Sequence, residues 1–195
     1  MEKRELRKLI RAEASMLEKE YIDAANAAVF ERVITLPEFI AAGTLFSYVS
    51  CEREPDTHRI IRYSLARGKR VYVPRITGSG LMAATRITDL EALEPDRYGI
   101  LTPAPGETAS PAELELSLVP CLSVAPNGYR LGHGGGYYDR FFAPAARAEV
   151  DRAAGAVMNG AVLCFERLLS AELPACAHDV RFGIVVTENR ILRLT

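Results

Sequence analysis

Several features that would place this chain of 195 residues in a special class of protein are missing from its sequence. No apolar run approaches the roughly 18 residues that a membrane-spanning helix needs. The first residues are charged and contain no apolar signal core. The formal net charge of −1 provides no basic field for general nucleic-acid binding. We therefore expect a cytoplasmic protein that binds neither membranes nor nucleic acid.

Cysteine and histidine are few and scattered, which argues against a metal centre built from them. The four cysteines include no Cys-x-x-Cys pair, so the sequence predicts neither a zinc site nor a disulfide framework. No two of the three histidines are spaced as metal ligands; they are His58, His133 and His178. The simplest account of the four cysteines is that they are reduced thiols in a cytosolic protein.

The pattern of apolar residues predicts alternating helices and strands. Helices are expected over residues 2–17, 21–34 and 57–66, and strands over 44–49, 70–74, 81–87, 116–120, 161–165 and 184–187. Residues 88–93 are expected to form a capped helical turn, and the proline- and glycine-rich residues 94–113 a long loop. The strand–helix–strand unit over 44–74 predicts parallel pairing, and the chain length predicts one domain.

The most informative stretch is a run of glycines between an apolar strand and an aromatic helix face. Five of the nine residues from 128 to 136 are glycine, and four aromatic residues follow at helical spacing: Tyr137, Tyr138, Phe141 and Phe142. Bare backbone N–H groups in such a loop approach an anion closely, at the positive end of the next helix. The stretch predicts a phosphate-binding strand–loop–helix, the alternative being a flexible surface loop.

The common nucleotide fingerprints do not fit this loop. No Gly-Lys-Ser/Thr is present, so the loop is not a P-loop. Tyr137 stands where the dinucleotide pattern requires its third glycine. We therefore expect phosphate to be bound by another geometry.

A basic stripe on the first helix is the second candidate feature. Lys3, Arg7 and Arg11 recur every four residues and so share one side of the helix. Glutamates are interspersed with them, which weakens an interpretation as an RNA-binding surface. The stripe is either a solvated face or, if the glycine loop lies opposite, a partner for polyphosphate.

The ends of the predicted strands supply further candidates, because ligands bind beyond the carboxyl ends of strands in parallel sheets. Residues 50–54, Arg75 and the glycine loop qualify. Glu54 could accept hydrogen bonds from a nitrogen-rich ligand, or it could be an exposed loop carboxylate. His178 and Asp179 form either a turn or a site at another strand edge.

The order of these features resembles the 5-formyltetrahydrofolate cyclo-ligase family, also called 5,10-methenyltetrahydrofolate synthetase. The matching motifs are Lys-x-x-x-Arg at 3–7, Tyr-x-Ser…Glu-x-Asp-Thr at 48–57, Gly-Lys-x-Val-x-x-Pro at 68–74, Val-Pro…Gly-x-Arg-Leu-Gly-x-Gly-Gly-Gly-Tyr-Tyr-Asp at 119–139, and His-Asp…Thr-Glu at 178–188. The resemblance implies a single-domain, three-layer α/β sandwich with a mostly parallel sheet, Rossmann-like and similar to the NagB/RpiA/CoA-transferase-like fold.

The resemblance also implies a reaction. In this family ATP and Mg²⁺ drive the closure of 5-formyltetrahydrofolate to 5,10-methenyltetrahydrofolate, with release of ADP and phosphate. The formyl oxygen takes the γ-phosphoryl group, and a second folate nitrogen then displaces phosphate. The implied partners are small molecules only, and the implied state is a monomer.

Carried over residue by residue, the resemblance assigns three groups of site residues. ATP would be bound by Lys3, Arg4, Arg7, Arg130, Leu131, Gly132, His133, Gly134, Gly135, Gly136, Tyr137 and Tyr138, of which Arg130 and Tyr137 would be catalytic. The folate would contact Val49, Glu54, Tyr98, Gly132, Gly134 and Gly136. Mg²⁺ would be bound by Asp139 and Asp179.

Three positions depart from the family pattern, namely Thr102, Leu168 and Gly183. They keep open a paralogue that binds folate or nucleotide without turnover. Two other rivals are an RNA-associated module that uses the basic helix and a sugar-phosphate isomerase on a similar sheet. The sequence assigns no reactivity to Cys51 and no function to residues 143–160.

Overall fold

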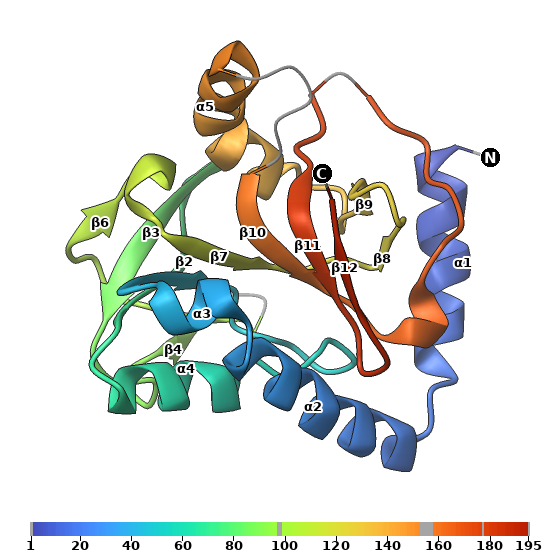
Figure 1. Ribbon diagram of the computed structural model, residues 1–195, viewed down its shortest axis with the longest axis horizontal. Coiled ribbons are helices and arrows are strands. Elements are labelled where there is room, and N and C mark those ends of the chain that lie inside the picture. Colours follow the sequence, from blue (N-terminus) through green and yellow to red (C-terminus); the bar gives the residue numbers. More distant parts are fainter. Residues whose placement is uncertain (1, 97–98, 153–157, 177, 195) are drawn as a thin grey trace.

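An eight-stranded sheet forms the centre of the protein, whose computed structural model describes residues 2–96, 99–152, 158–176 and 178–194. The strands lie in the order β12-β11-β10-β7-β1-β2-β3-β6 (Figure 1). Their bounds are β1 Thr44–Ser47, β2 Arg70–Gly78, β3 Leu81–Ile87, β6 Thr108–Ala109, β7 Leu116–Val119, β10 Met158–Leu163, β11 Phe182–Val186 and β12 Ile191–Arg193.

The middle of this sheet is parallel and its margins are antiparallel. Strands β11, β10, β7, β1 and β2 run parallel to one another, whereas β12 pairs antiparallel with β11, β3 with β2, and β6 with β3. Strands β1 and β7 are buried along their whole length. Strands buried on both faces are typical of parallel sheets covered by helices, and this explains why short runs of mostly apolar residues predicted them.

Helices cover both faces of the sheet. Helices α2 (Lys19–Ile34), α3 (Pro37–Ala41) and α4 (His58–Ala66) lie on one face, and α1 (Lys3–Ser15) and α5 (Tyr137–Arg152) on the other (Figure 1). Successive side chains of a strand point to opposite faces. Accordingly, Leu45 packs in the cluster beneath α2–α4, while Phe46 meets Phe142 of α5 with ring centroids 5.7 Å apart. The expected α/β class with a mostly parallel sheet between helical layers is confirmed.

Short elements carry the chain from the sheet to the glycine loop. After β7, β8 (Ser123–Val124) pairs antiparallel with β9 (Arg130–Leu131), and residues 132–136 then lead directly into α5. A second small ladder joins β4 (Glu94–Pro95) to β5 (Leu101–Thr102), and two 3₁₀ turns are η1 (Pro111–Glu113) and η2 (Glu166–Leu168). The strand–loop–helix order predicted for the glycine stretch is present, with a hairpin inserted before the loop.

The predicted helices and the parallel pairing of β1 with β2 are confirmed, and two other predicted segments are wrong. Residues 88–93 form bends and a turn without helix, closed by a hydrogen bond from Leu93 N to Leu90 O (3.3 Å). Residues 94–113 are not one loop, because β4, β5, β6 and η1 lie within them. Helix α3 and strand β12, which are five and three residues long, were not predicted. In the described part of the chain no helix is long and apolar enough to cross a membrane.

Lys69, which belongs to one of the family motifs, has a structural role. Its Nζ donates hydrogen bonds to Phe39 O (2.7 Å) and Ala42 O (2.5 Å), at the carboxyl end of α3. Cations stabilise the last carbonyls of a helix, where the helix dipole is negative. Burial lowers the pKa of Lys69, as expected for an ammonium group enclosed by this turn.

Replacing Lys69 by methionine removes the charge while keeping the length of the side chain. The free energy of unfolding is expected to fall by about 2 kcal/mol, since hydrogen bonds from a charged donor contribute about 1.5–3 kcal/mol. Urea denaturation measures the change. Lys19→Met is the matched control, because Lys19 is exposed and its pair with Asp23 lies on the surface of α2. Equal urea midpoints for the two variants would contradict the capping role.

Candidate functional site

Two cavities adjoin the segments that follow the carboxyl ends of the neighbouring parallel strands β7 and β1. The first, of about 540 Å³, includes Pro120, which directly follows β7. The second, of about 500 Å³, is bordered by residues 50–54, which follow the end of β1. This edge is where ligands bind in parallel α/β sheets, and the sequence predicted both segments as ligand-binding.

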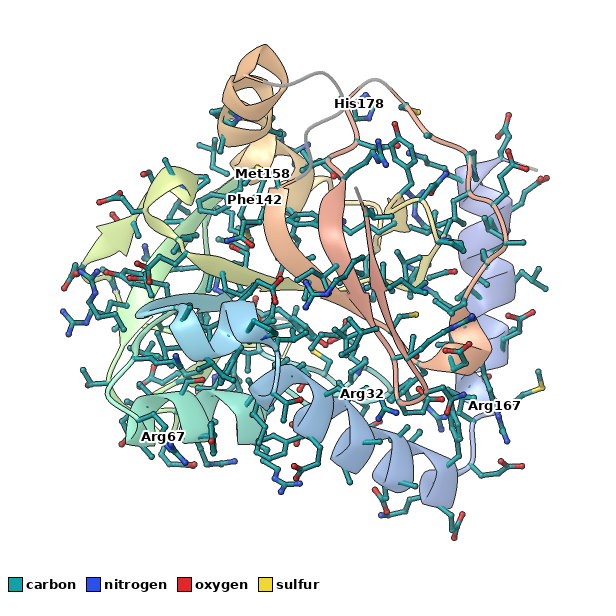
Figure 2. All side chains as sticks on the ribbon, viewed as in Figure 1. Arg32, Arg67, Phe142, Met158, Arg167 and His178 are labelled. Atoms are coloured by element: carbon teal, nitrogen blue, oxygen red, sulfur yellow. The ribbon has the colours of Figure 1, made fainter. Side chains whose placement is uncertain are left out.

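Besides Pro120 and Arg130, four parts of the chain border the first cavity. They are the start of α1, the glycine loop (residues 132–136), the first turn of α5, and the segment before β11 that carries Cys176, His178 and Asp179. Figure 2 shows His178 at the top of the view, between α5 and the start of α1. Segments from both ends of the chain therefore meet around the glycine loop.

The basic face of α1 lies against the glycine loop. Arg7 Nε donates to Gly132 O (2.8 Å), and Arg11 Nη2 donates to His133 O (3.1 Å). Lys3 Nζ lies 2.5 Å from Asp179 Oδ2, which borders the same cavity. The sequence favoured a polyphosphate partner for the basic stripe only if the glycine loop lay opposite it. The loop does lie opposite the stripe.

Two glycines of the loop adopt backbone conformations that side chains disfavour. Gly134 has a φ of +111° and Gly136 a φ of +64°. A Cβ atom on Gly136 would also lie 2.8 Å from Arg140 Nη1. The loop is therefore a turn of defined backbone conformation that packs against arginines.

A buried ion pair supports the loop from behind. The Arg130 side chain is 4% exposed, and its Nη2 donates to Asp139 Oδ1 at 2.9 Å. The guanidinium lies between the rings of Tyr138 and Phe182, 5.7 Å and 5.5 Å from their centroids. A buried cation requires such a partner, because desolvation of an unpaired charge is strongly unfavourable. Arg130 thereby joins β9 to the first turn of α5.

The two predicted metal ligands, Asp139 and Asp179, border the same cavity. Asp139 Oδ1 also accepts a hydrogen bond from Val180 N (3.2 Å), the residue next to Asp179. Asp179 Oδ2 accepts from Cys176 N at 2.7 Å in addition to Lys3. The described residues contain no group of three or more histidine, cysteine or carboxylate side chains that could hold a metal by themselves. Two carboxylates are a suitable donor set for Mg²⁺ that arrives with phosphates.

Glu54 joins the second cavity to the first. Its Oε1 lies 3.1 Å from His133 Nε2 in the glycine loop, and its Oε2 accepts from Cys51 N at 2.9 Å. The side chain is 14% exposed, so Glu54 is not a freely exposed loop carboxylate. His133 borders the first cavity and Glu54 the second, so the two compartments meet at this contact.

The motif at 48–57 holds the Glu54 loop in place through its own hydrogen bonds. Tyr48 Oη donates to Pro55 O (2.8 Å), and Thr57 Oγ1 donates to Tyr48 O (2.7 Å). Ser50 and Thr57 exchange two further bonds of 3.0 Å, each from a backbone N–H to the other's hydroxyl. Most polar residues of this motif therefore have a structural role, and Glu54 is the one that reaches the glycine loop.

Comparison with known proteins decides the family. A profile described as the 5-formyltetrahydrofolate cyclo-ligase family matches residues 1–188. The chain belongs to this family. The class of enzyme that the motifs indicated is thereby confirmed.

Individual relatives agree with the family match. A probable 5-formyltetrahydrofolate cyclo-ligase of Caenorhabditis elegans is 36% identical over 148 residues, which are 72% of this chain and 72% of that protein. One of Schizosaccharomyces pombe is 25% identical over 201 residues, 99% of this chain and 98% of that protein. The NMR structure of Aquifex aeolicus 5,10-methenyltetrahydrofolate synthetase has a TM-score of 0.81 at 26% identity, covering 99% of this chain and 93% of that one.

Most residues that the family resemblance assigned to ATP lie together, and a few lie elsewhere. The wall of the first cavity includes Lys3, Arg7, Arg130, Gly132, His133, Gly134, Gly135, Gly136, Tyr137 and Tyr138. Arg4 is exposed and borders neither cavity, and Leu131 is buried in the core. Of the folate residues, Val49 is buried behind β1 among Ile61 and Val71, and Tyr98 lies outside the described residues.

Sequence reasoning missed Arg140, which connects the glycine loop to the β2–β3 hairpin. Its Nη2 donates to Gly135 O (2.5 Å) and its Nε to Gly80 O (2.8 Å), and it borders the first cavity. Its position beside Asp139, in the first turn after a glycine-rich loop, is a sequence signal that could have identified it.

Burial, and secondarily the charge of Glu54, raises the pKa of the Cys51 thiol. A raised pKa lowers the thiolate fraction at neutral pH, and thiolate is the reactive form. The structure therefore gives Cys51 no enhanced nucleophilicity.

Replacing Asp139 by asparagine tests the buried ion pair. The free energy of unfolding is expected to fall by about 3 kcal/mol, because the nearly buried Arg130 guanidinium loses its counter-charge. Chemical denaturation without any ligand measures this. In Asp23→Asn, which breaks a solvent-exposed pair, a loss below about 1 kcal/mol is expected. If Asp139→Asn were no less stable than this control, the pair would not hold the loop.

Proposed function

We propose that this protein closes 5-formyltetrahydrofolate to 5,10-methenyltetrahydrofolate while ATP is converted to ADP and phosphate. The observation that carries the proposal is the placement of Lys3 and Arg7 across a glycine loop at the start of α5, beside two carboxylates. Phosphoryl transfer requires positioning and neutralisation of charge more than a reactive side chain. The first cavity offers these elements.

The glycine loop and α1 would bind the polyphosphate of ATP. Backbone N–H groups at the start of α5 carry partial positive charge, and Lys3 and Arg7 add full charges on the facing wall. Arg7 is already fixed by its bond to Gly132 O. A side chain held in place before binding loses less conformational entropy when the ligand arrives.

Asp139 and Asp179 would hold Mg²⁺ on the same side of this cavity. Mg²⁺ is usually bound by one or two carboxylates together with phosphate oxygens and water, and two carboxylates are what this wall supplies. When bound, the ion would neutralise phosphate charge. Lys3 and Arg130, which contact these carboxylates, would keep them oriented.

The second cavity would receive the folate, with Glu54 as the polar anchor. A carboxylate accepts hydrogen bonds from the N–H groups of a pterin ring, and the Glu54 side chain is already oriented by Cys51 N. The Glu54–His133 contact joins this cavity to the phosphate side. That junction suits a reaction in which a group on the folate meets the γ-phosphate.

The proposed chemistry breaks and forms bonds in two steps. The formyl oxygen attacks the γ-phosphorus, the bond to the bridging oxygen breaks, and ADP leaves. The second folate nitrogen then attacks the former formyl carbon and loses its proton, and the carbon–oxygen bond breaks with release of phosphate. Arg130 and Tyr137, which border the cavity, would stabilise charge and order the loop, and no nucleophilic side chain is needed.

The rival of a paralogue without turnover receives no support from the three departures. Thr102 lies in β5, Gly183 in β11, and Leu168 is buried in the core at η2. None of the three borders either cavity. The RNA-associated rival is weakened because Arg7 and Arg11 are directed toward the glycine loop of the same protein, where they donate to its carbonyls.

A spectrophotometric assay tests the function directly. Purified protein, 5-formyltetrahydrofolate and Mg²⁺ are mixed with and without ATP, and the absorbance of the methenyl product is followed. Product is expected only when ATP is present. Saturable binding of folate and nucleotide without product would favour the paralogue, and turnover without nucleotide would favour an isomerase-type enzyme.

Arginine substitutions on α1 test which side chains face the nucleotide. Arg7→Ala is expected to weaken binding of a non-hydrolysable ATP analogue about 10- to 100-fold, the range expected for lost charge-assisted hydrogen bonds. Lys8→Ala, on an exposed side of the same helix, serves as the control for lost charge. Arg4→Ala is expected to resemble this control, since Arg4 borders neither cavity. Calorimetric titration measures the affinity of each of the three variants for the ATP analogue. Equal losses of affinity would indicate a long-range effect of charge.

A further inference from the structure

Arg53 has an unusual backbone conformation for its residue type. Its φ is +65°, the only positive φ of a non-glycine residue in the described part of the chain. Such a conformation is unfavourable for a side chain with a Cβ atom and persists where surrounding contacts hold it. Arg53 lies immediately before Glu54, in the loop that borders the second cavity.

The Arg53 side chain supplies those contacts by reaching the end of α1. Its Nη1 donates to Ala14 O (2.9 Å) and Leu17 O (3.2 Å), just where α1 ends at Ser15. The last turn of α1 contains no basic residue of its own. Arg53 therefore provides, from a distant part of the chain, the cation that stabilises the negative end of this helix.

Adjacent residues thus point to two different partners. Arg53 contacts the carboxyl end of α1, while Glu54 contacts His133 of the glycine loop. The glycine loop in turn receives Arg7 and Arg11 from α1. The contacts form a closed ring from the Glu54 loop to α1, from α1 to the glycine loop, and back to Glu54.

This ring includes walls of both cavities. Lys3 and Arg7 border the first cavity, and Glu54 borders the second. Within α1, Ile10 is buried, and Leu6 and Ala14 are partly buried against the core, so the polar contacts add to this packing in placing the helix. A shift of α1 would move the basic side chains relative to Glu54.

We propose that Arg53 is a positioning residue that locks α1 to the Glu54 loop and thereby couples the binding of ligands in the two cavities. The identity of those ligands, ATP and 5-formyltetrahydrofolate, rests on the proposed function. Filling either cavity further restrains the three segments of the ring relative to one another, and the second ligand then binds to a protein in which that restraint is already present. Each ligand consequently raises the affinity for the other by the same factor.

Two variants remove the contact without adding backbone strain. Arg53→Gly accepts the positive φ freely, and Arg53→Asn tolerates it while being too short to reach α1. Arg67→Gly is the control, because Arg67 is an exposed arginine at the end of α4, far from α1 in Figure 2. If one of the two Arg53 variants failed to fold, the comparison would use the other Arg53 variant.

The first measurement is the affinity for a non-hydrolysable ATP analogue with and without saturating 5-formyltetrahydrofolate. In the unaltered protein and in Arg67→Gly, the folate is expected to tighten nucleotide binding at least 5-fold, the lower end of typical coupling. In Arg53→Gly and Arg53→Asn this factor is expected to fall close to 1. Retention of the full factor in both variants would overturn the proposal, as would its absence from the unaltered protein.

Hydrogen exchange without ligands supplies a readout that does not depend on the proposed function. Loss of Arg53 is expected to speed exchange in α1 and in the glycine loop, whereas a local role would change only the residues around 51–54. Faster exchange confined to the residues around 51–54 would overturn the locking role. If neither ligand bound the unaltered protein, the proposed function would fail and the exchange result alone would decide whether Arg53 holds the ring.

Discussion

The contact between the basic face of α1 and the glycine loop is the interaction on which the site depends. Arg7 and Arg11 donate to carbonyl groups of Gly132 and His133, so the helix and the loop fix each other. Side chains bonded to backbone oxygens keep their positive charge near the loop without neutralising it. The loop therefore combines bare N–H groups with nearby cations, which is the environment that a polyphosphate requires.

Behind this contact, a buried charge helps to hold the loop in place. Glycine-rich segments lose much conformational entropy on folding, and the loop is held on two sides by arginines. Arg130 is paired with Asp139 between two aromatic rings, and Arg140 bonds to Gly135 O. Because Asp139 serves both the ion pair and the proposed magnesium site, stability and catalysis share one carboxylate. Mutations of Asp139 therefore require a stability measurement beside an activity measurement.

Motif residues divide into those that reach the cavities and those that support them. Lys69 caps α3, and Glu188 accepts hydrogen bonds from Tyr21 Oη (2.5 Å) and Glu166 N (2.9 Å), away from the cavities. From sequence, such residues resemble ligand contacts, since both kinds are polar and occur in the same motifs. Their bonding partners come from distant segments, and a motif does not reveal them. Arg53 lay between recognised residues and carried no sequence signal for its backbone conformation.

The sequence alone determined the longer helices, the parallel core strands and the glycine loop, because these depend on local periodicity and on the backbone chemistry of a few adjacent residues. It could state that Lys3, Arg7 and Arg11 share a helix side, but not what that side faces. Only the tertiary structure decided that Lys3 meets Asp179, 176 positions away, and that Glu54 meets His133, 79 positions away. Such contacts follow from the order of strands in the sheet, which brings distant segments of the chain together. Local sequence preferences do not encode that order.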